Sequence, residues 1–322
     1  MKKKRLLNKN VIITGASSGI GRVSAIEFAK EGANLLLFAR NIDRLNEVKK
    51  EIEKLGSKVE VFVGDVTNKE SLESAVKKCI DVYGSVDIFY SNAGIYLRQY
   101  VKDLRIDQIR KIMEVDFYGN MNALYSILPY FLERNEGTFI TTCSVDGKIG
   151  LPGDAAYCSA KFALNGFFQV LRQELRGTNV HTCVIYPGRM DTPQINHVDC
   201  PKISKKNDPR LVAKAAIKGV LKHRTEIFVP RFSSKLLINS YNVSNKLSDW
   251  LTRVNGLEGV DNGKEAINEA KWHTLSLIEV ESFSGKDSNE SSKRAITLCP
   301  RVHLRIRNYI FLILLVLSLY SH

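Results

Sequence analysis

The stretch Thr14-Gly15-Ala16-Ser17-Ser18-Gly19-Ile20-Gly21 decides the fold of this chain. It follows the apolar run Val11–Thr14 and leads directly into a helical pattern. Gly15 permits a tight turn, Gly19 lets the backbone approach a pyrophosphate, and Gly21 lets helix and strand pack closely. Backbone N–H groups and the positive end of the helix dipole can then hold phosphates. The context of strand, glycine turn and helix favours a dinucleotide-binding unit over a purely structural turn.

Outward from this stretch, short apolar runs alternate with longer amphipathic ones from about Asn10 to about Pro230. Continuous apolar runs suit strands that are buried on both faces of a parallel sheet. The expected strands are Val11–Thr14, Asn34–Phe38, Lys58–Val63, Val86–Tyr90, Thr138–Thr142, Val180–Tyr186 and Glu226–Val229. The expected helices are Ile20–Glu31, Ile42–Leu55, Lys69–Tyr83, Ile106–Glu133, Ala155–Arg176, Pro209–Lys222 and Lys235–Val254. The predicted fold class is α/β, a doubly wound Rossmann fold with a mostly parallel, seven-stranded sheet.

We expect one Rossmann-type domain over residues 8–259, with its C-terminal helix on the substrate side, and a C-terminal extension over 260–322. The extension contains a polar, linker-like stretch, Ser284–Ser292, and a purely apolar run, Tyr309–Tyr320. As a helix, this run extends only about 18 Å, against a hydrocarbon core of about 30 Å. A membrane span is therefore disfavoured, whereas a buried or interfacial helix and an unpacked tail both remain open. No function is predicted for residues 276–322.

Composition excludes several classes of protein. Of the 322 residues, 44% are hydrophobic and 25% are charged, an ordinary globular mixture that rules out global disorder. Six scattered cysteines include no CxxC pair, and six histidines show no ligand spacing. We therefore expect no disulfide scaffold and no metal, as in a protein of the reducing cytoplasm.

The formal net charge of +13 is concentrated in basic residues near the two ends of the chain, at positions 2–9 and 293–307. Basic tails attract phosphate or anionic lipid without specifying a partner, so solvated tails are the favoured interpretation. No specific nucleic-acid partner is expected, and contact of the C-terminal tail with a membrane surface is a weaker alternative. Leu6-Leu7 is followed by polar residues rather than a long apolar region, so we expect no signal peptide and a cytoplasmic location.

The end of the second expected strand predicts which nicotinamide cofactor is preferred. An NAD-selective site needs a carboxylate there for the adenosine ribose hydroxyls. The residues present are Ala39, Arg40 and Asn41, and the guanidinium of Arg40 suits a 2′-phosphate. NADP(H) is therefore predicted over NAD(H), with an ordinary surface arginine as the alternative.

Two side chains near the start of one expected helix suggest acid–base chemistry. Tyr157 and Lys161 are four residues apart and so share a helix face. A nearby ammonium stabilises phenolate and lowers the tyrosine pKa. Ser144 follows the strand Thr138–Thr142, where its hydroxyl can lie beside the helix start and polarise a carbonyl oxygen.

Together these residues resemble the short-chain dehydrogenase/reductase family. The resemblance covers about residues 8–232, and the joint occurrence of its patterns in order is highly specific. The matching patterns are TGASSGIG at 14–21, Asp65-Val66, SNAG at 91–94, Ser144, YCSAK at 157–161, and Pro187-Gly188 with Thr192. The resemblance implies that Tyr157 is the general acid in carbonyl reduction and the base in alcohol oxidation. It also implies that Lys161 holds the nicotinamide ribose and that Ser144 binds the substrate oxygen.

The same resemblance implies a cofactor cleft. Asp65 and Val66 would border the adenine, and Thr192 would lie near the nicotinamide carboxamide. Asp65 could instead only cap a strand-to-helix turn, and Asn92 could be an ordinary turn residue. The expected cofactor-binding residues are Gly15, Ser17, Ser18, Gly19, Ile20, Gly21, Arg40, Asp65, Val66, Asn92, Ala93, Gly94, Tyr157, Lys161, Pro187, Gly188 and Thr192.

The chain departs from the family pattern at two positions. Asp116 stands where the family usually has an asparagine that helps to hold a water of the proton relay. Aspartate accepts hydrogen bonds but has no amide to donate, and its charge would stabilise the lysine ammonium, so we expect a working relay with altered pH dependence. Ser18 stands where several NADP-dependent relatives have a basic residue, which leaves the 2′-phosphate to Arg40, with help from Ser17; Arg22 has a weaker claim.

The predicted function is hydride transfer between NADP(H) and a carbonyl or secondary alcohol. The alternative is a non-catalytic NADP-binding regulatory or scaffold protein, which Asp116 alone favours. The substrate segments are 95–103, 148–154 and 189–208. Their apolar residues suggest a bulky hydrophobic substrate, although several could merely pack under a loop; these are Tyr96, Tyr100, Ile149, Leu151, Met190 and Ile195. The resemblance also implies a homodimer or homotetramer formed through the two long helices, Ile106–Glu133 and Ala155–Arg176.

Overall fold

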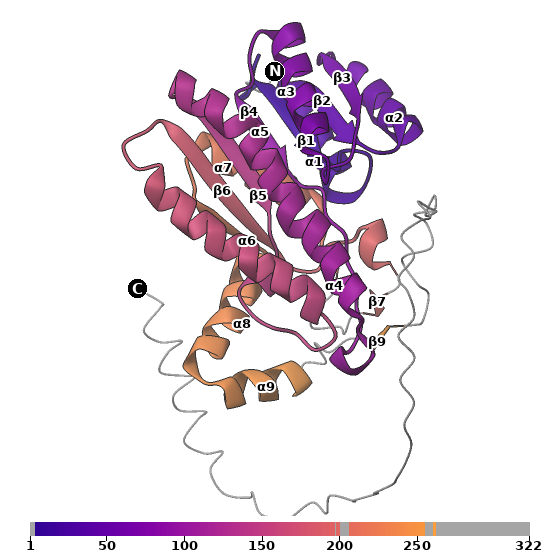
Figure 1. Ribbon diagram of the computed structural model, residues 1–322, viewed down its shortest axis with the longest axis vertical. Helices are drawn as coiled ribbons and strands as arrows, with labels where there is room; N and C mark the ends of the chain where they lie inside the picture. Colours follow the sequence, from indigo (N-terminus) through magenta and orange to yellow (C-terminus); the bar gives the residue numbers. More distant parts are fainter. Residues whose placement is uncertain (1–3, 197, 200–205, 255–259, 262–322) are drawn as a thin grey trace, which may run out of the picture. The chain divides into compact units, whose positions relative to one another are not determined.

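The computed structural model describes residues 4–196, 198–199, 206–254 and 260–261, and all structural statements below concern these residues. Seven parallel strands form one sheet in the order β3-β2-β1-β4-β5-β6-β8 (Figure 1). The strands are β1 (Asn10–Thr14), β2 (Asn34–Ala39), β3 (Val59–Val63), β4 (Ile88–Ser91), β5 (Gly137–Thr142), β6 (Val180–Pro187) and β8 (Glu226–Val229). The predicted doubly wound α/β fold is confirmed. A short antiparallel pair, β7 (Val198–Asp199) with β9 (Val260–Asp261), lies outside this sheet.

Helices cover both faces of the sheet, as its apolar strands require. On one face α1 (Gly19–Lys30), α2 (Ile42–Glu53) and α7 (Arg210–Leu221) bury Phe28, Val48 and Val212 against the strands. On the other face lie α3 (Lys69–Tyr83), α5 (Gly119–Arg134) and α6 (Ala155–Glu174), which bury Leu72, Leu124 and Phe168. Figure 1 shows α5 and α6 side by side in front of the sheet.

Local signals fix several helix ends. Asn41 and Asn68 accept hydrogen bonds from the backbone N–H of Arg44 and Ser71, which caps α2 and α3. Gly84 ends α3 in the left-handed conformation, with φ +84°. These caps explain why the observed bounds lie within two residues of the expected ones.

The single long helix predicted over Ile106–Glu133 is wrong. The structure has α4 (Ile106–Met113), a π-helical turn (Glu114–Tyr118) and then α5. A π turn adds one residue to the helical register and re-aims the side chains within it. It carries Asp116, whose side chain is 0% exposed. The departure from regular helix therefore falls on a candidate site residue.

The helix predicted over Lys235–Val254 is also divided. The structure has α8 (Arg231–Val243) and α9 (Asn245–Val254), separated at Ser244. The Ser244 hydroxyl accepts a hydrogen bond from the backbone N–H of Leu247 at 3.5 Å, as an N-cap does. A new helix therefore begins there. The predicted extension over 260–322 lies, apart from Val260–Asp261, outside the described residues.

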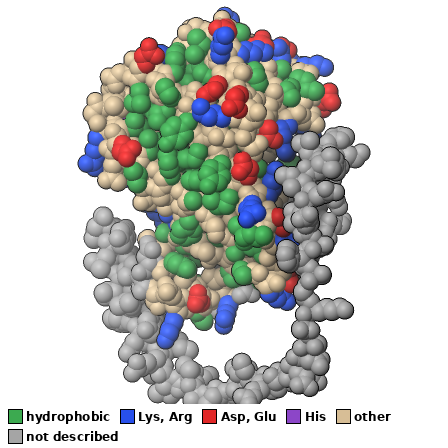
Figure 2. Space-filling view, viewed as in Figure 1, with side chains coloured by type: hydrophobic (Ala, Val, Ile, Leu, Met, Phe, Trp, Pro, Cys, Tyr) green, Lys and Arg blue, Asp and Glu red, His purple; other side chains and the backbone are tan. Residues whose placement is uncertain are grey.

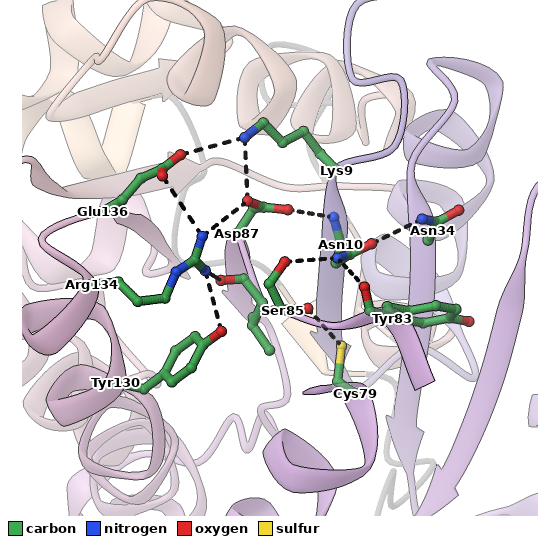
Figure 3. Close-up of polar contacts among 11 residues, drawn as sticks. Lys9, Asn10, Asn34, Cys79, Tyr83, Ser85, Asp87, Tyr130, Arg134 and Glu136 are labelled. Atoms are coloured by element: carbon green, nitrogen blue, oxygen red, sulfur yellow. Dashed lines mark hydrogen bonds and ion pairs between the residues drawn. The ribbon is translucent and has the colours of Figure 1, made fainter. Parts of the chain in front are cut away.

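A polar cluster ties the amino ends of the strands together (Figure 3). Asp87 accepts hydrogen bonds from the backbone N–H of Asn10 at 2.8 Å and from Lys9 Nζ at 3.2 Å. Arg134 Nη1 donates to the carbonyl of Val86 at 2.8 Å, and Asn34 Nδ2 donates to Asn10 Oδ1 at 2.9 Å. The cluster fixes the amino edge of β1, β2 and β4. It thereby positions the opposite, carboxyl edge, where the candidate site residues gather.

Candidate active site

The glycine turn between β1 and α1 has the shape that a phosphate cradle needs. Gly15 and Gly19 have φ values of +65° and +51°, which favour glycine. A side chain at Gly15 would lie 2.9 Å from Ala93 Cα, and one at Gly21 would overlap the Gly15 carbonyl and lie 2.7 Å from Asn92 Nδ2. The first turn of α1 carries no acidic residue, and Ser18 makes no side-chain cap. The helix start therefore presents backbone donors and a positive dipole to the cleft, which fits a dinucleotide phosphate.

The SNAG stretch is bonded to this cradle. Thr14 Oγ1 accepts hydrogen bonds from the backbone N–H of Asn92 and Ala93 at 2.9 and 3.1 Å. Asn92 Nδ2 donates to the Thr14 carbonyl at 3.3 Å, and Asn92 Oδ1 accepts from Thr142 Oγ1 at 3.0 Å. Asn92 is thus a cross-link between β1, β4 and β5, which is more than the ordinary turn residue considered from the sequence.

Asp116 and Lys161 form a buried ion pair beside this cross-link. Lys161 Nζ lies 3.0 Å from Asp116 Oδ2, and the two side chains are 4% and 0% exposed. Asp116 Oδ1 accepts from the backbone N–H of Ile95 at 2.7 Å, and Lys161 Nζ also donates to the carbonyl of Thr142 at 3.3 Å. Burial raises the pKa of Asp116, and the Lys161 ammonium opposes that rise. The expected pairing of the aspartate with the lysine is present in the structure.

The residues around Asp116 hold it in place. Asn120, one helical turn further on, donates through Nδ2 to the Asp116 carbonyl at 2.9 Å. Its Oδ1 accepts from Ser91 and Thr141, each at 2.7 Å. A side chain at Gly94 would lie 3.1 Å from Asp116 Oδ2. The π turn is therefore attached to the ends of β4 and β5. Asn120 was missed from the sequence because an asparagine within a helix carries no local signal.

Tyr157 and Lys161 face the same space at the start of α6, as their spacing predicts. Lys161 Nζ lies 5.3 Å from the Tyr157 ring centroid. Burial raises the pKa of the Tyr157 phenol well above its usual value, and the carboxylates of Asp116 and Asp146 raise it further, while a hydrogen bond with Ser144 lowers it. The sequence predicts a lowered pKa here, and the structure shows the opposite. The physical reasons are the burial of the phenol, which is the largest cause, and the negative charges of Asp116 and Asp146 nearby.

Ser144 lies at the end of β5 and begins a short 3-10 turn, Val145–Gly147. Its hydroxyl donates to Asp146 Oδ2 at 3.1 Å and accepts from the backbone N–H of Asp146 at 3.2 Å. The Pro187 carbonyl lies 3.5 Å from Ser144 Oγ. Burial and the nearby Asp154 raise the pKa of Asp146 to about 7. Asp146 was not among the expected site residues, because its burial comes from elements far away in the sequence.

A second buried ion pair lies next to Tyr157 and joins two of the expected substrate segments. Arg98 Nη1 lies 3.1 Å from Asp154 Oδ2, and both side chains are almost fully buried. Tyr96 donates its hydroxyl to Asp154 Oδ1 at 2.7 Å, and its ring meets that of Tyr157 edge to face, with centroids 5.1 Å apart. These two segments therefore carry more polar groups beside Tyr157 than the apolar lining expected from the sequence. Of the expected apolar lining, Ile149 and Met190 are buried in the protein interior.

The residues expected around the adenosine gather at the ends of β2 and β3. Arg40 is exposed, and its Nη1 lies 3.7 Å from Asp65 Oδ2. Asp65 Oδ1 also accepts from the backbone N–H and the hydroxyl of Thr67, so it does cap the local turn. Val66 is buried, whereas Ser17 is half-buried and Ser18 exposed at the cradle. Arg22 instead forms an ion pair with Glu51 on α2.

The segment after β6 closes the other side of the cleft. The Gly188 backbone N–H donates to the carbonyl of Val229 at 2.7 Å, which anchors the turn after Pro187. Thr192 is buried, and a side chain at Gly19 would meet its Cβ at 3.4 Å. Gln194 Nε2 donates to the carbonyl of Gly94 at 3.5 Å. The glycine turn is therefore close to Asn92, Ala93 and Thr192. Asp116, which lies next to Gly94, connects this region to Lys161.

Within the described part of the chain, no three or more histidine, cysteine, aspartate or glutamate side chains lie together so that they could hold a metal ion. Nor does any helix there have the length and apolar character needed to cross a bilayer.

Comparison with known proteins places the chain in a family. The family model for short chain dehydrogenases matches residues 9–200. An uncharacterized oxidoreductase of Listeria innocua is 36% identical over 187 residues, covering 58% of this chain and 75% of that protein. Estradiol 17-beta-dehydrogenase 11 of Rattus norvegicus is 34% identical over 232 residues, covering 71% and 78% of the two chains.

Solved structures agree on the fold. A short-chain dehydrogenase/reductase of Burkholderia phymatum in complex with NAD has a TM-score of 0.69 at 20% identity, covering 76% of this chain and 96% of that one. An alcohol dehydrogenase of the archaeon Thermococcus sibiricus, complexed with 5-hydroxy-NADP, has a TM-score of 0.62 at 28% identity, covering 68% and 95%. The chain belongs to the short-chain dehydrogenase/reductase family, oxidoreductases that act on alcohol and carbonyl groups with a nicotinamide cofactor.

Proposed function

We propose that the protein is an NADP(H)-dependent oxidoreductase that interconverts a carbonyl compound and a secondary alcohol, with Tyr157 as the general acid and base. The observation that carries this proposal is the position of Tyr157, Ser144 and Lys161 beside the glycine cradle. Nicotinamide, when bound, supplies or accepts the hydride. The protein's own side chains transfer the proton and bind the substrate oxygen.

In carbonyl reduction, Tyr157 donates its phenolic proton to the substrate oxygen while Ser144 holds that oxygen by a hydrogen bond. The raised pKa of Tyr157 keeps the phenol protonated at neutral pH, which favours reduction over oxidation. Lys161, paired with Asp116, lies within reach of both the phenol ring and the Thr142 carbonyl. It is the cation that we propose for the nicotinamide ribose hydroxyls.

Two features support NADP(H) over NAD(H). The end of β2 carries no acid among Ala39, Arg40 and Asn41. The Arg40 guanidinium is 61% exposed and only loosely paired with Asp65, so it can turn toward a 2′-phosphate. Ser17 and Ser18, at the adjacent turn, supply hydroxyls.

We propose a bulky hydrophobic substrate. Its support is the aromatic wall of Tyr96 and Tyr157, together with the names of two relatives, an estradiol dehydrogenase and a mouse 17-beta-hydroxysteroid dehydrogenase. The Arg98 guanidinium and the Asp154 carboxylate are bonded to each other and to Tyr96 and Pro152, so their charges are paired within the protein.

A homodimer or homotetramer through α5 and α6 is the assembly we propose. Figure 2 shows hydrophobic side chains gathered on the face that these helices form. Large apolar residues exposed there are Tyr118, Tyr125, Leu132, Phe162 and Val170. A patch of this kind marks an interaction site in a water-exposed protein. Light scattering on the purified protein and on Val170→Asp tests it, since the variant should shift the mass toward that of the monomer.

A cytoplasmic location, and contact of the C-terminal tail with a membrane surface, remain predictions. Flotation with anionic liposomes, of the full chain and of a chain ending at Gly259, tests the second. Equal flotation of the two would contradict a role for the tail.

The second candidate function is a non-catalytic NADP-binding regulator. The Asp116–Lys161 ion pair favours it, because it occupies the charge that would otherwise acidify Tyr157. One experiment separates the two functions. Nicotinamide absorbance is followed with NADPH and NADH against a panel of hydrophobic ketones, and cofactor binding is measured by fluorescence titration. Tight binding of NADPH with no turnover of any ketone would favour the regulator.

A further inference from the structure

Asp146 makes the closest polar contacts to the proposed substrate-binding hydroxyl. Its backbone N–H donates to Ser144 Oγ at 3.2 Å, and its Oδ2 accepts from the same hydroxyl at 3.1 Å. A serine hydroxyl has one proton to donate and two lone pairs. When the Asp146 carboxyl is ionised it can only accept, so the single proton of Ser144 points to it and away from a substrate oxygen.

The neutral carboxyl has the opposite effect. A protonated Asp146 donates to Ser144 Oγ, and the Ser144 proton is then released to a substrate carbonyl. This reversal needs no movement of the backbone, because only one proton changes its place between two oxygens 3.1 Å apart. The substrate oxygen gains negative charge in the transition state, which reduction and oxidation share, so a hydrogen-bond donor at this point helps both directions.

The surroundings of Asp146 make both states reachable near neutral pH. Burial and the carboxylate of Asp154, at the start of α6, raise the pKa of Asp146, while Ser144, Arg189 after β6 and Arg98 after β4 lower it, for a value of about 7. The other titratable groups within its field are the buried or half-buried Cys143, Tyr157 and Cys158. The pKa values of these three are all raised, so they stay neutral while Asp146 titrates.

We propose that Asp146 is a positioning residue that sets the direction of the Ser144 hydrogen bond, so that its neutral form leaves the Ser144 proton for the substrate oxygen and is the active form in both directions of the reaction. This inference rests on the proposed function. The alternative for Asp146 is a purely local role, as the acidic residue in the first turn of the three-residue 3-10 helix.

The test measures kcat/KM for reduction and for oxidation at pH values on both sides of about 7, with the whole protein. In the native protein, reduction should fall about tenfold per pH unit above this value, because the neutral fraction of the carboxyl falls tenfold per unit. Oxidation should stay nearly level over the same range, because reduction consumes one proton and the overall equilibrium therefore already shifts about tenfold toward the ketone per pH unit.

The variant Asp146→Asn has a permanently neutral amide, which can donate to Ser144 Oγ at every pH. We expect its reduction rate to lose the decline above about 7 and its oxidation rate to keep rising above that value, where the native oxidation rate levels off. Asp146→Ala, which has no group to titrate, must lose the same decline at a lower overall rate. Asp107→Asn, which changes an exposed carboxylate on α4, is the matched control and should keep the native profile.

The outcomes separate the inference from the proposed function. If the native protein reduces ketones and the decline above about 7 persists in a folded Asp146→Asn or Asp146→Ala, the inference is overturned and the enzyme assignment stands. If no ketone is turned over by the native protein while NADPH still binds, the proposed function itself fails, and the inference fails with it.

Discussion

The charged side chains at the two edges of the sheet differ in their exposure to water. At the amino edge, Lys9 and Arg134 both pair with Asp87 and with Glu136, in a cluster whose lysine and glutamate side chains are 45% and 57% exposed to water (Figure 3). At the carboxyl edge, Asp116, Asp146 and Asp154 lie among buried side chains, and each has a raised pKa because burial disfavours the charged form. The first arrangement only ties strands together. The second keeps carboxyl groups at a cost in folding free energy, which a protein retains where chemistry needs them.

The largest expected effect comes from breaking the buried pair at the carboxyl edge. Lys161→Met leaves Asp116 without its cation and should lower the free energy of unfolding by about 3–5 kcal/mol, measured by urea denaturation at neutral pH. The raised pKa of Asp116 in the folded state also sets how the stability depends on pH. Folding favours the protonated carboxyl, so the free energy of unfolding of the variant should fall as pH rises.

The matched control is Lys9→Met at the amino edge, where the lysine side chain is 45% exposed. We expect a loss of at most about 1 kcal/mol, because water already screens that ion pair. Adding Asp116→Asn to Lys161→Met should restore most of the lost stability. Equal losses of unfolding free energy in Lys161→Met and Lys9→Met would contradict the proposed difference between the two edges.

The next effect concerns the cofactor. Arg40→Ala should reduce kcat/KM for NADPH by about 10–100-fold and leave that for NADH nearly unchanged, since a hydrogen bond to a charged group is worth about 1.5–3 kcal/mol. Initial rates with both cofactors measure it. Arg172→Ala, an exposed arginine on α6, controls for the loss of charge. A similar loss for both cofactors would remove Arg40 from the 2′-phosphate site.

A smaller effect sharpens the role of Asp116. Asp116 raises the pKa of Tyr157, so Asp116→Asn should lower it and move the pH at which Tyr157 loses its proton downward. The pH–rate profile of alcohol oxidation, which needs the phenolate, should therefore shift to lower pH. An unchanged profile would show that Asp116 takes no part in setting the acid–base behaviour of the site.

The sequence predicts what local patterns determine. All seven strands lie within two residues of their expected bounds, because buried apolar runs between turns allow little else. The glycine turn, the SNAG stretch and the Tyr157–Lys161 pair lie at the same edge of the sheet, because parallel strands bring their carboxyl ends to one edge. The family resemblance likewise implied that Asp116 lies near the lysine and stabilises its ammonium, and the structure has the two as an ion pair.

Tertiary packing accounts for what the sequence leaves out. Arg98 and Asp154 are 56 residues apart, and no spacing rule predicts that they share a buried site. The π turn at Glu114–Tyr118 departs from regular helix because its end is attached to β4 and β5 through Asn120. The raised pKa of Tyr157 follows from burial and from two carboxylates that come from different elements. These properties depend on neighbours that meet only in the folded chain.

The most direct test of the central claim is turnover by Tyr157→Phe, with Tyr130→Phe in the cluster at the opposite, amino edge of the sheet as the control. The account predicts a loss of about 10²–10⁴-fold in the rate of ketone reduction, with NADPH binding retained, and native turnover in the control. Ketone reduction by Tyr157→Phe at the native rate would contradict it.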